Sequence, residues 1–332
     1  MRWSEPATLA LVGSLAFLVA AAATAWARHH ALRRGLLDLP GERRSHAQPT
    51  PRGGGIGIAL VGLAAFAWLG TADGASWWLA GGGLLLVAGA GWWDDHRPAS
   101  PLLRLSLHAL AGAALAAALA LRGGQPLEMA LGFALAVGLV NVWNFMDGID
   151  GIAASQGALY ALALSMVLAG PAAMLAIALA AACLGFLPFN LPRARIFLGD
   201  VGSGAVGYLL AALLGVAALE LPRAQWPLLL LPASAFLVDA GMTLAWRFWG
   251  NERWWTPHVQ HLYQRASRRF GHGRVTAAYA AWTLAAIIAM LSAMQASPGM
   301  ALGGGAGVFL VAMTAWIVLH RRWNGAMEGF GA

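Results

Sequence analysis

The sequence has no lysine and one cysteine, and only 11% of its 332 residues are charged. The absence of lysine excludes a Schiff base and any mechanism that requires a catalytic lysine amine. A single cysteine, Cys183, excludes an intrachain disulfide framework and a cysteine-ligated metal site, and its apolar surroundings predict a small buried side chain. Soluble globular chains are about 25% charged, so this chain is too poor in charge for that class.

Apolar residues make up 59% of the chain, and the mean hydropathy is +0.65. This composition rules out disorder and predicts an all-α, polytopic integral membrane protein. Eleven apolar stretches are close to the roughly 20 residues that a helix needs to cross a bilayer. They form one transmembrane domain over residues 1–332, with no room for a soluble domain. The expected spans are 6–27, 54–70, 77–93, 105–121, 129–143, 152–169, 172–189, 202–219, 226–246, 276–294 and 300–319.

Arginine is distributed unevenly between the two sets of loops that alternating spans create. One set contains 18 arginines, and the other contains Arg2, Arg122 and Arg223. The positive-inside rule makes the arginine-rich side cytoplasmic, with the N-terminus in the periplasm and the C-terminus in the cytoplasm. We therefore expect a multi-pass membrane protein. The first stretch is expected to be a retained span rather than a signal peptide, because an Arg- and His-rich loop follows it.

The aspartates gather on the expected cytoplasmic side, where seven of the eight lie, and only Asp73 faces outward. Carboxylates at the ends of membrane helices are costly unless they are paired, solvated or bound to a cation. Asp94 and Asp95 directly follow the third stretch, and two adjacent carboxylates repel each other. They mark either a solvated helix end or a polar site that holds a cation or shares a proton.

Two further acidic motifs contain glycine. Asp147 and Asp150 lie in the segment NFMDGIDG, where a spacing of three places both carboxylates on one face of a turn or helix. Asp200 lies in IFLGDVGSG, immediately before the eighth stretch, where helix N–H groups bind phosphate and a carboxylate holds a divalent cation. The structural alternatives are an Asp-Gly turn for the first motif and a helix cap for the second.

His258 and His261 would share one face of a helix, with Tyr263 and Arg265 as further donors nearby. Zinc is disfavoured, because no third ligand and no H-E-x-x-H pattern accompany the pair. A pair that faces an anion or a sugar and a plain surface pair both remain open.

The charged groups together predict a reaction. Carboxylates suit a hard cation such as Mg²⁺, and arginines of the loop 38–55, Arg52 among them, serve either as topology anchors or as phosphate ligands. A cytoplasmic site of this kind predicts phosphoryl transfer between a soluble diphosphate and an acceptor dissolved in the membrane. Asp239, inside the ninth stretch, is a further functional candidate whose partner the sequence does not reveal.

The order of these motifs resembles that of the polyprenyl-phosphate N-acetylhexosamine-1-phosphate transferase family, of the glycosyltransferase family 4 type. The resemblance covers nearly the whole chain. It implies transfer of a sugar-1-phosphate from a UDP-sugar to undecaprenyl phosphate, which gives a lipid-linked sugar diphosphate and UMP. The matching segments are 38–55, 91–104 (GWWDDHRPASPLLR), 141–151 (NVWNFMDGIDG), 186–204 (FLPFNLPRARIFLGDVGSG) and 257–265.

The resemblance also implies roles for individual residues. Asp94 would deprotonate the lipid phosphate, Asp200 would bind Mg²⁺ (or Mn²⁺ as a substitute), and Asn190 and Phe197 would bind uracil by a hydrogen bond and by stacking. The implied catalytic residues are Asp94, Asp95, Asp147, Asp150, His258 and His261. The implied substrate-binding residues are His46, Thr50, Arg52, Arg104, Asn144, Asn190, Phe197 and Arg265.

Two departures from the family pattern bear on the branch. His258 and His261 stand where the peptidoglycan-precursor branch has consecutive histidines, which favours the branch that initiates O-antigen or related polysaccharides. Arg104 stands where relatives often have lysine, which preserves the charge but changes its geometry. We expect no nucleic-acid partner, and a homodimer is possible.

Two rivals fit the sequence less well. A secondary transporter of an anionic solute predicts polar residues near the middle of the membrane and often repeated halves, whereas here the carboxylates lie mostly at one face and no repeat is found. A lipid phosphotransferase of the CDP-alcohol type needs an Asp-rich signature that 147–155 does not match. A one-step displacement is the preferred mechanism, and a two-step route through an aspartyl intermediate is its alternative.

Overall fold

The computed structural model describes residues 5–38, 49–252 and 258–328. The chain is an all-α, polytopic membrane protein and is 81% helical. Its two described strands, β1 (Leu37–Asp38) and β2 (Thr50–Pro51), have two residues each and pair as an antiparallel hairpin. The longer helices before the break described below are α1 (Pro6–Arg34), α2 (Ile56–Ala72), α3 (Ser76–His96), α4 (Pro101–Leu121), α5 (Pro126–Phe145), α6 (Ile152–Ser165), α7 (Gly170–Asn190) and α8 (Gly199–Glu220). After it come α10 (Ser234–Trp249), α11 (Leu262–Phe270), α12 (His272–Ala293) and α13 (Pro298–Glu328).

In the described part of the chain, eight helical segments are long and apolar enough to cross a membrane. The shorter apolar helices α2 and α6 also coincide with expected spans, as does α3. The ninth expected span is not one continuous helix. It divides into α9 (Trp226–Leu229), a 3₁₀ turn over Leu231–Ala233 and α10. Pro232 lies at this break, where its missing N–H cannot continue the helical hydrogen bonds. The count of eleven crossings stays a prediction.

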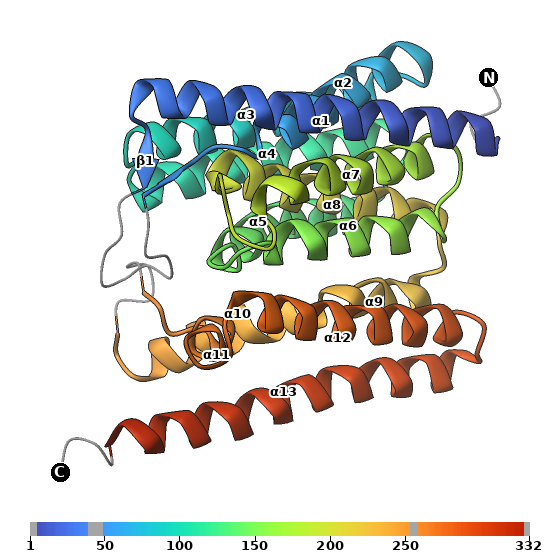
Figure 1. The fold of residues 1–332 in the computed structure, drawn as a ribbon. Helices are drawn as coiled ribbons and strands as arrows, with labels where there is room; N and C mark the ends of the chain where they lie inside the picture. Colours follow the sequence, from blue (N-terminus) through green and yellow to red (C-terminus); the bar gives the residue numbers. More distant parts are fainter. Residues whose placement is uncertain (1–4, 39–48, 253–257, 329–332) are drawn as a thin grey trace.

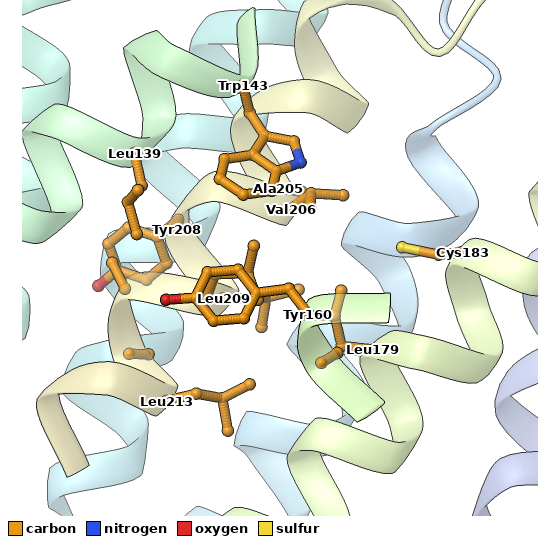
Figure 2. Close-up of a cluster of buried hydrophobic side chains, with 14 of the residues drawn as sticks. Leu139, Trp143, Tyr160, Leu179, Cys183, Ala205, Val206, Tyr208, Leu209 and Leu213 are labelled. Carbon is orange, nitrogen blue, oxygen red and sulfur yellow. The ribbon is translucent and has the colours of Figure 1, made fainter. Parts of the chain in front are cut away.

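Helix α8 forms the centre of the bundle, because every residue from Val201 to Ala218 is buried. Figure 2 shows Tyr160 of α6 and Tyr208 of α8 packed among leucines, with Trp143 beside them. Each buried hydroxyl donates to a backbone oxygen, Tyr160 to Leu229 at 2.6 Å and Tyr208 to Ala111 at 3.4 Å. Cys183 belongs to the same core and is fully buried, as expected.

The C-terminal helices α10, α12 and α13 lie to one side of this bundle, with α13 outermost (Figure 1). Helix α1 begins at one end of the bundle and α13 finishes at the other, where α11 and the hairpin also lie (Figure 1). At the end away from the hairpin, Arg122 Nη1 lies 3.2 Å from Asp73 Oδ2, just before α3 begins. The acidic pair Asp94-Asp95 stands at the opposite end of α3, roughly 30 Å away along a helix of this length.

Candidate active site

Asp95 joins the end of α3 to the beginning of α8. Its two carboxylate oxygens accept hydrogen bonds from the backbone N–H groups of Asp200 and Val201, at 3.0 and 3.2 Å. Both donors belong to the first turn of α8, where unpaired N–H groups and the helix dipole favour a negative charge. A carboxylate from one helix therefore caps another.

Asp94 points toward α4. Its Oδ1 accepts a hydrogen bond from the backbone of Ala99 at 2.7 Å, and its Oδ2 lies 3.2 Å from Nη1 of Arg104. The same Nη1 atom lies 3.2 Å from Oδ2 of Asp200. One guanidinium from α4 thus bridges carboxylates of α3 and α8. Asp94 and Asp95 face different donors, which offset part of the repulsion between these adjacent carboxylates.

Two glycines allow this close approach. A Cβ atom at Gly91 of α3 would lie 2.4 Å from the backbone nitrogen of Val201, so any larger residue would push α3 away from α8. A Cβ atom at Gly199 would lie 2.5 Å from Oδ2 of Asp95, and the φ of Gly199 is +75°, in the left-handed region. The glycine before Asp200 is therefore required by both backbone geometry and space.

The segment before α2 runs beside the segment before α8. The backbone of Phe197 donates to the oxygen of Pro51 at 2.8 Å, and Gly54 donates to the oxygen of Phe197 at 2.9 Å. This pairing places Phe197, the expected uracil-stacking residue, beside the segment 51–54. Phe197 is half-buried. Its stacking role stays a prediction.

Arg52 follows β2 and is 39% exposed, with its Nη2 atom 2.9 Å from Oδ2 of Asp38. Thr50 is buried and pairs with Asp38 in the hairpin. His46, the other substrate-binding residue expected in this loop, lies outside the described residues.

The loop 146–151 carries the second acidic motif between α5 and α6. Burial raises the pKa of Asp147 well above its usual range, and the carboxylates of Asp200 and Asp95 raise it further. These three carboxylates therefore share one electrostatic environment, although their motifs are far apart in the sequence. Asn144, at the end of α5, donates from Nδ2 to the hydroxyl of Ser203 in α8 at 3.4 Å.

Asp150 faces a residue that the sequence analysis did not identify. Its Oδ2 lies 3.2 Å from Nδ1 of His272, the first residue of α12. One turn later, the hydroxyl of Thr276 donates to the backbone oxygen of Asp150 at 2.8 Å. No local motif marks His272, because it follows an ordinary glycine turn and meets Asp150 only in the folded chain.

Asn190 connects two loops of the site. Its Oδ1 accepts from the backbone of Gly151 at 2.6 Å, and its Nδ2 donates to the oxygen of Ile196 at 2.9 Å. The side chain is 4% exposed. Both ends of this amide bind the backbone, so Asn190 holds the loop 146–151 against the segment before α8. Its expected contact with uracil stays a prediction.

His258 and His261 do not lie on a helix, contrary to the expectation, because α11 begins only at Leu262. Their rings are nevertheless 4.8 Å apart. His261 is 2% exposed, which excludes a plain surface pair. Burial, followed by the charges of His261 and Arg247, lowers the pKa of His258 to about 4. Arg265, one turn into α11, is half-buried, and burial lowers the pKa of its guanidinium.

Within the described ranges, no three His, Cys, Asp or Glu side chains come close enough to form a ready-made metal cage. Mg²⁺ does not need one, because it commonly binds through one or two carboxylates, several waters and substrate phosphates. Asp200 supplies a hard oxygen ligand of the kind that this mode of binding uses. The carboxylates of Asp95 and Asp147 lie close enough to it to share one electrostatic environment. The residues present therefore fit such a cation.

The chain is similar to several known proteins. A family model described as glycosyl transferase family 4 matches residues 77–218. A decaprenyl-phosphate N-acetylglucosaminephosphotransferase of Mycobacterium tuberculosis is 30% identical over 306 residues, which cover 77% of this chain and 75% of the relative. The Mycolicibacterium smegmatis protein of the same name is 33% identical over 239 residues, which cover 61% of this chain and 59% of that relative.

A second group of relatives carries another name. A phospho-N-acetylmuramoyl-pentapeptide-transferase of a Synechococcus strain is 40% identical over 154 residues, or 40% of this chain and 41% of the relative. Both names describe transferases of an N-acetylated sugar phosphate. The match to the M. tuberculosis protein covers more of the chain than the family model does. The chain belongs to glycosyl transferase family 4.

Proposed function

We propose that the protein transfers an N-acetylhexosamine-1-phosphate from a UDP-sugar to undecaprenyl phosphate, and that it releases UMP. The observation that carries this proposal is the bridge of Arg104 between Asp94 and Asp200, which joins three helices. The names of the relatives support the general reaction, since they join a polyprenyl phosphate with an N-acetylated sugar phosphate.

In the proposed reaction, an oxygen of the lipid phosphate attacks the β-phosphorus of the UDP-sugar. The bond from that phosphorus to the oxygen shared with the α-phosphate breaks, and UMP takes the electron pair. Asp94 accepts the remaining proton of the lipid phosphate. Arg104, whose Nη1 atom lies 3.2 Å from Oδ2 of Asp94, would hold this carboxylate in place for that role.

Asp200 would hold Mg²⁺, which when bound would neutralise charge on the diphosphate. Arg52 supplies further positive charge close enough to act on Asp147, and Arg104 contacts both Asp94 and Asp200. His258 would meet the sugar or diphosphate as a neutral imidazole at pH 7, because its pKa is about 4. Phosphoryl transfer needs little more than such positioning and neutralisation.

The finer assignments belong to the same proposal. The separated histidines favour a role in starting O-antigen or a related envelope polysaccharide. The arginine distribution favours a site facing the cytoplasm of the bacterial inner membrane. Substitution of Mn²⁺ for Mg²⁺ belongs to the same proposal.

Exchange of radiolabelled UMP into UDP-sugar tests the reaction directly. The purified chain should catalyse this exchange only with polyprenyl phosphate and Mg²⁺ present, and a panel of UDP-N-acetylhexosamines should identify the sugar. Asp200→Asn should reduce turnover about 100- to 1,000-fold, the loss typical of removing one charge-stabilising group.

Asp73→Asn is the matched control, because it changes the same residue type at the far end of α3. It should keep most of the activity. The proposal is wrong if no UDP-sugar supports exchange or if Asp200→Asn turns over at the wild-type rate. Trapping of a covalent sugar-phosphate enzyme would replace the one-step displacement with the two-step route.

A further inference from the structure

Asp239 is a buried carboxylate in α10, only 1% exposed. Both of its oxygens accept hydrogen bonds from the protein. Oδ1 accepts from the backbone of Leu262 at 2.8 Å and from the indole of Trp316 at 3.2 Å. Oδ2 accepts from the backbone of Tyr263 at 3.0 Å and from the hydroxyl of Tyr279 at 2.8 Å. A buried carboxylate is tolerated when its lone pairs are satisfied in this way.

Two of these donors are the first backbone N–H groups of α11. Asp239 therefore caps α11 from a different helix, just as Asp95 caps α8. Tyr279 and Trp316, which also donate to Asp239, belong to α12 and α13. A fifth donor, the hydroxyl of Thr243, lies one turn along α10 itself, 3.3 Å from Oδ1. One carboxylate thus attaches the start of α11 to three membrane helices. The contact needs two acceptor oxygens, which aspartate has and asparagine lacks.

Helix α11 in turn contacts the loop 146–151. The hydroxyl of Tyr263 donates to the backbone oxygen of Phe145 at 2.9 Å. A Cβ atom on Gly148 would lie 2.2 Å from that hydroxyl, so the side chain lies directly on the loop. Tyr263 therefore binds Asp239 through its backbone and the acidic loop through its side chain.

We propose that Asp239 is a positioning residue for the transfer reaction. It fixes α11, and through Tyr263 it fixes the loop that carries Asp147, without contact with the reacting atoms. Nδ1 of His261 lies 3.8 Å from Oδ1 of Asp239, beyond hydrogen-bond distance but within the range of an ion pair. The proposal rests on the proposed function for its effect on turnover. Its structural half is independent of any substrate.

Hydrogen–deuterium exchange of the full-length purified protein tests the structural half. Asp239→Asn places an amide N–H₂ group against two N–H donors and so weakens the attachment of α11. The exchange rate of the backbone amides in 262–270 and 145–151 should increase at least about tenfold, which corresponds to about 1.4 kcal/mol of lost protection. Exchange within α8 should stay unchanged. Ser234→Ala is the matched control, because it removes a polar contact of α10 with Trp282 of α12 that does not involve α11. Its exchange in 262–270 should equal that of the wild type.

Turnover tests the functional half. Asp239→Asn should lower kcat about 100-fold, as misplacement by about 1 Å does, with a much smaller change in KM. Tyr263→Phe, which keeps the ring and removes the hydroxyl, should also lower kcat. The double variant should be no worse than Asp239→Asn, because both substitutions interrupt one path. Asp239→Glu retains two acceptor oxygens and should recover part of the rate.

The outcomes are distinguishable. Unchanged exchange in 262–270 of Asp239→Asn overturns the positioning role whatever the substrate is. Altered exchange with wild-type kcat, or fully additive losses in the double variant, overturns its link to catalysis. If Asp239→Asn does not fold, Tyr263→Phe decides, since wild-type kcat and unchanged exchange in 145–151 would refute the path through Tyr263. If no UDP-sugar is turned over by the wild type, the proposed function fails while the exchange experiment still decides the structural half.

Discussion

The carboxylate of Asp95 accepts a hydrogen bond from the backbone N–H of Asp200 at 3.0 Å, although the two residues are 105 positions apart. This contact attaches the last turn of α3 to the first turn of α8. It places the proposed base, Asp94, and the proposed metal ligand, Asp200, on either side of one guanidinium. The proposed reaction therefore depends on a helix cap supplied by another helix.

Substitution of Asp95 should lower the stability of the protein, whereas substitution of Asp94 should not. Asp95→Asn retains one of two acceptor oxygens at the cap, and loss of a helix cap costs about 1–2 kcal/mol, so the apparent Tm should fall. Asp94→Asn leaves the cap intact and should abolish turnover with little change in Tm. Thermal unfolding followed by tryptophan fluorescence, together with the exchange assay, measures both effects. Equal Tm losses in the two variants would contradict the cap assigned to Asp95.

Asp147 should destabilise the apo protein at neutral pH. Its folded-state pKa is raised, chiefly by burial, whereas in the unfolded chain it ionises at about 3.9. Unfolding therefore releases a proton between these two values, and stability falls as the pH rises through that window. Asp147→Asn should raise the Tm at pH 7 by a few degrees and should match the wild type near pH 3.5.

The measurement is a pair of Tm-against-pH curves for wild type and Asp147→Asn in chelator. The curves should meet at acidic pH and diverge above it. Parallel curves, or a variant that is less stable at pH 7, would show that Asp147 is not held in a charge-disfavouring environment. Turnover of the variant should be lost regardless of its higher Tm.

His272 should act through Asp150. His272→Ala removes the 3.2 Å contact to Oδ2, and Thr276→Val removes the hydrogen bond to the backbone oxygen of the same residue. Each should lower turnover about tenfold, because a misplaced loop carries Asp147 with it. A double-mutant cycle of His272→Ala with Asp150→Asn should give a coupling of about 0.5–3 kcal/mol. Additive losses would mean that the pair does not work as a unit.

The helices could largely be predicted from the sequence because each apolar run carries its own signal. A stretch such as 202–219 lies at a depth of the membrane where water cannot bind its backbone N–H and C=O groups. It must pair these groups within a helix, whatever the helix packs against. The acidic motifs could be assigned to one end of the bundle for the same reason, since each follows or precedes such a run. The broken helix at 226–246 was less accessible, because proline in a membrane span is compatible with either a kink or a break.

The individual contacts could not be predicted. Nothing local to Arg104 indicates that it would bridge two aspartates, and nothing near Gly271 indicates that the next residue would meet Asp150. The expected helix at His258 was wrong because Asp239, almost twenty residues earlier, fixes where α11 begins.

Hydropathy and charge by themselves determined that this chain is a helical membrane protein with its acidic and arginine-rich segments collected at one end. Each charged residue placed in hydrocarbon costs free energy on its own, so this preference can be read from the sequence without the fold. Only the tertiary structure decided which carboxylate caps a helix, which meets a guanidinium and which binds a histidine. These choices depend on distances between helices, and such distances are set by packing over the whole bundle.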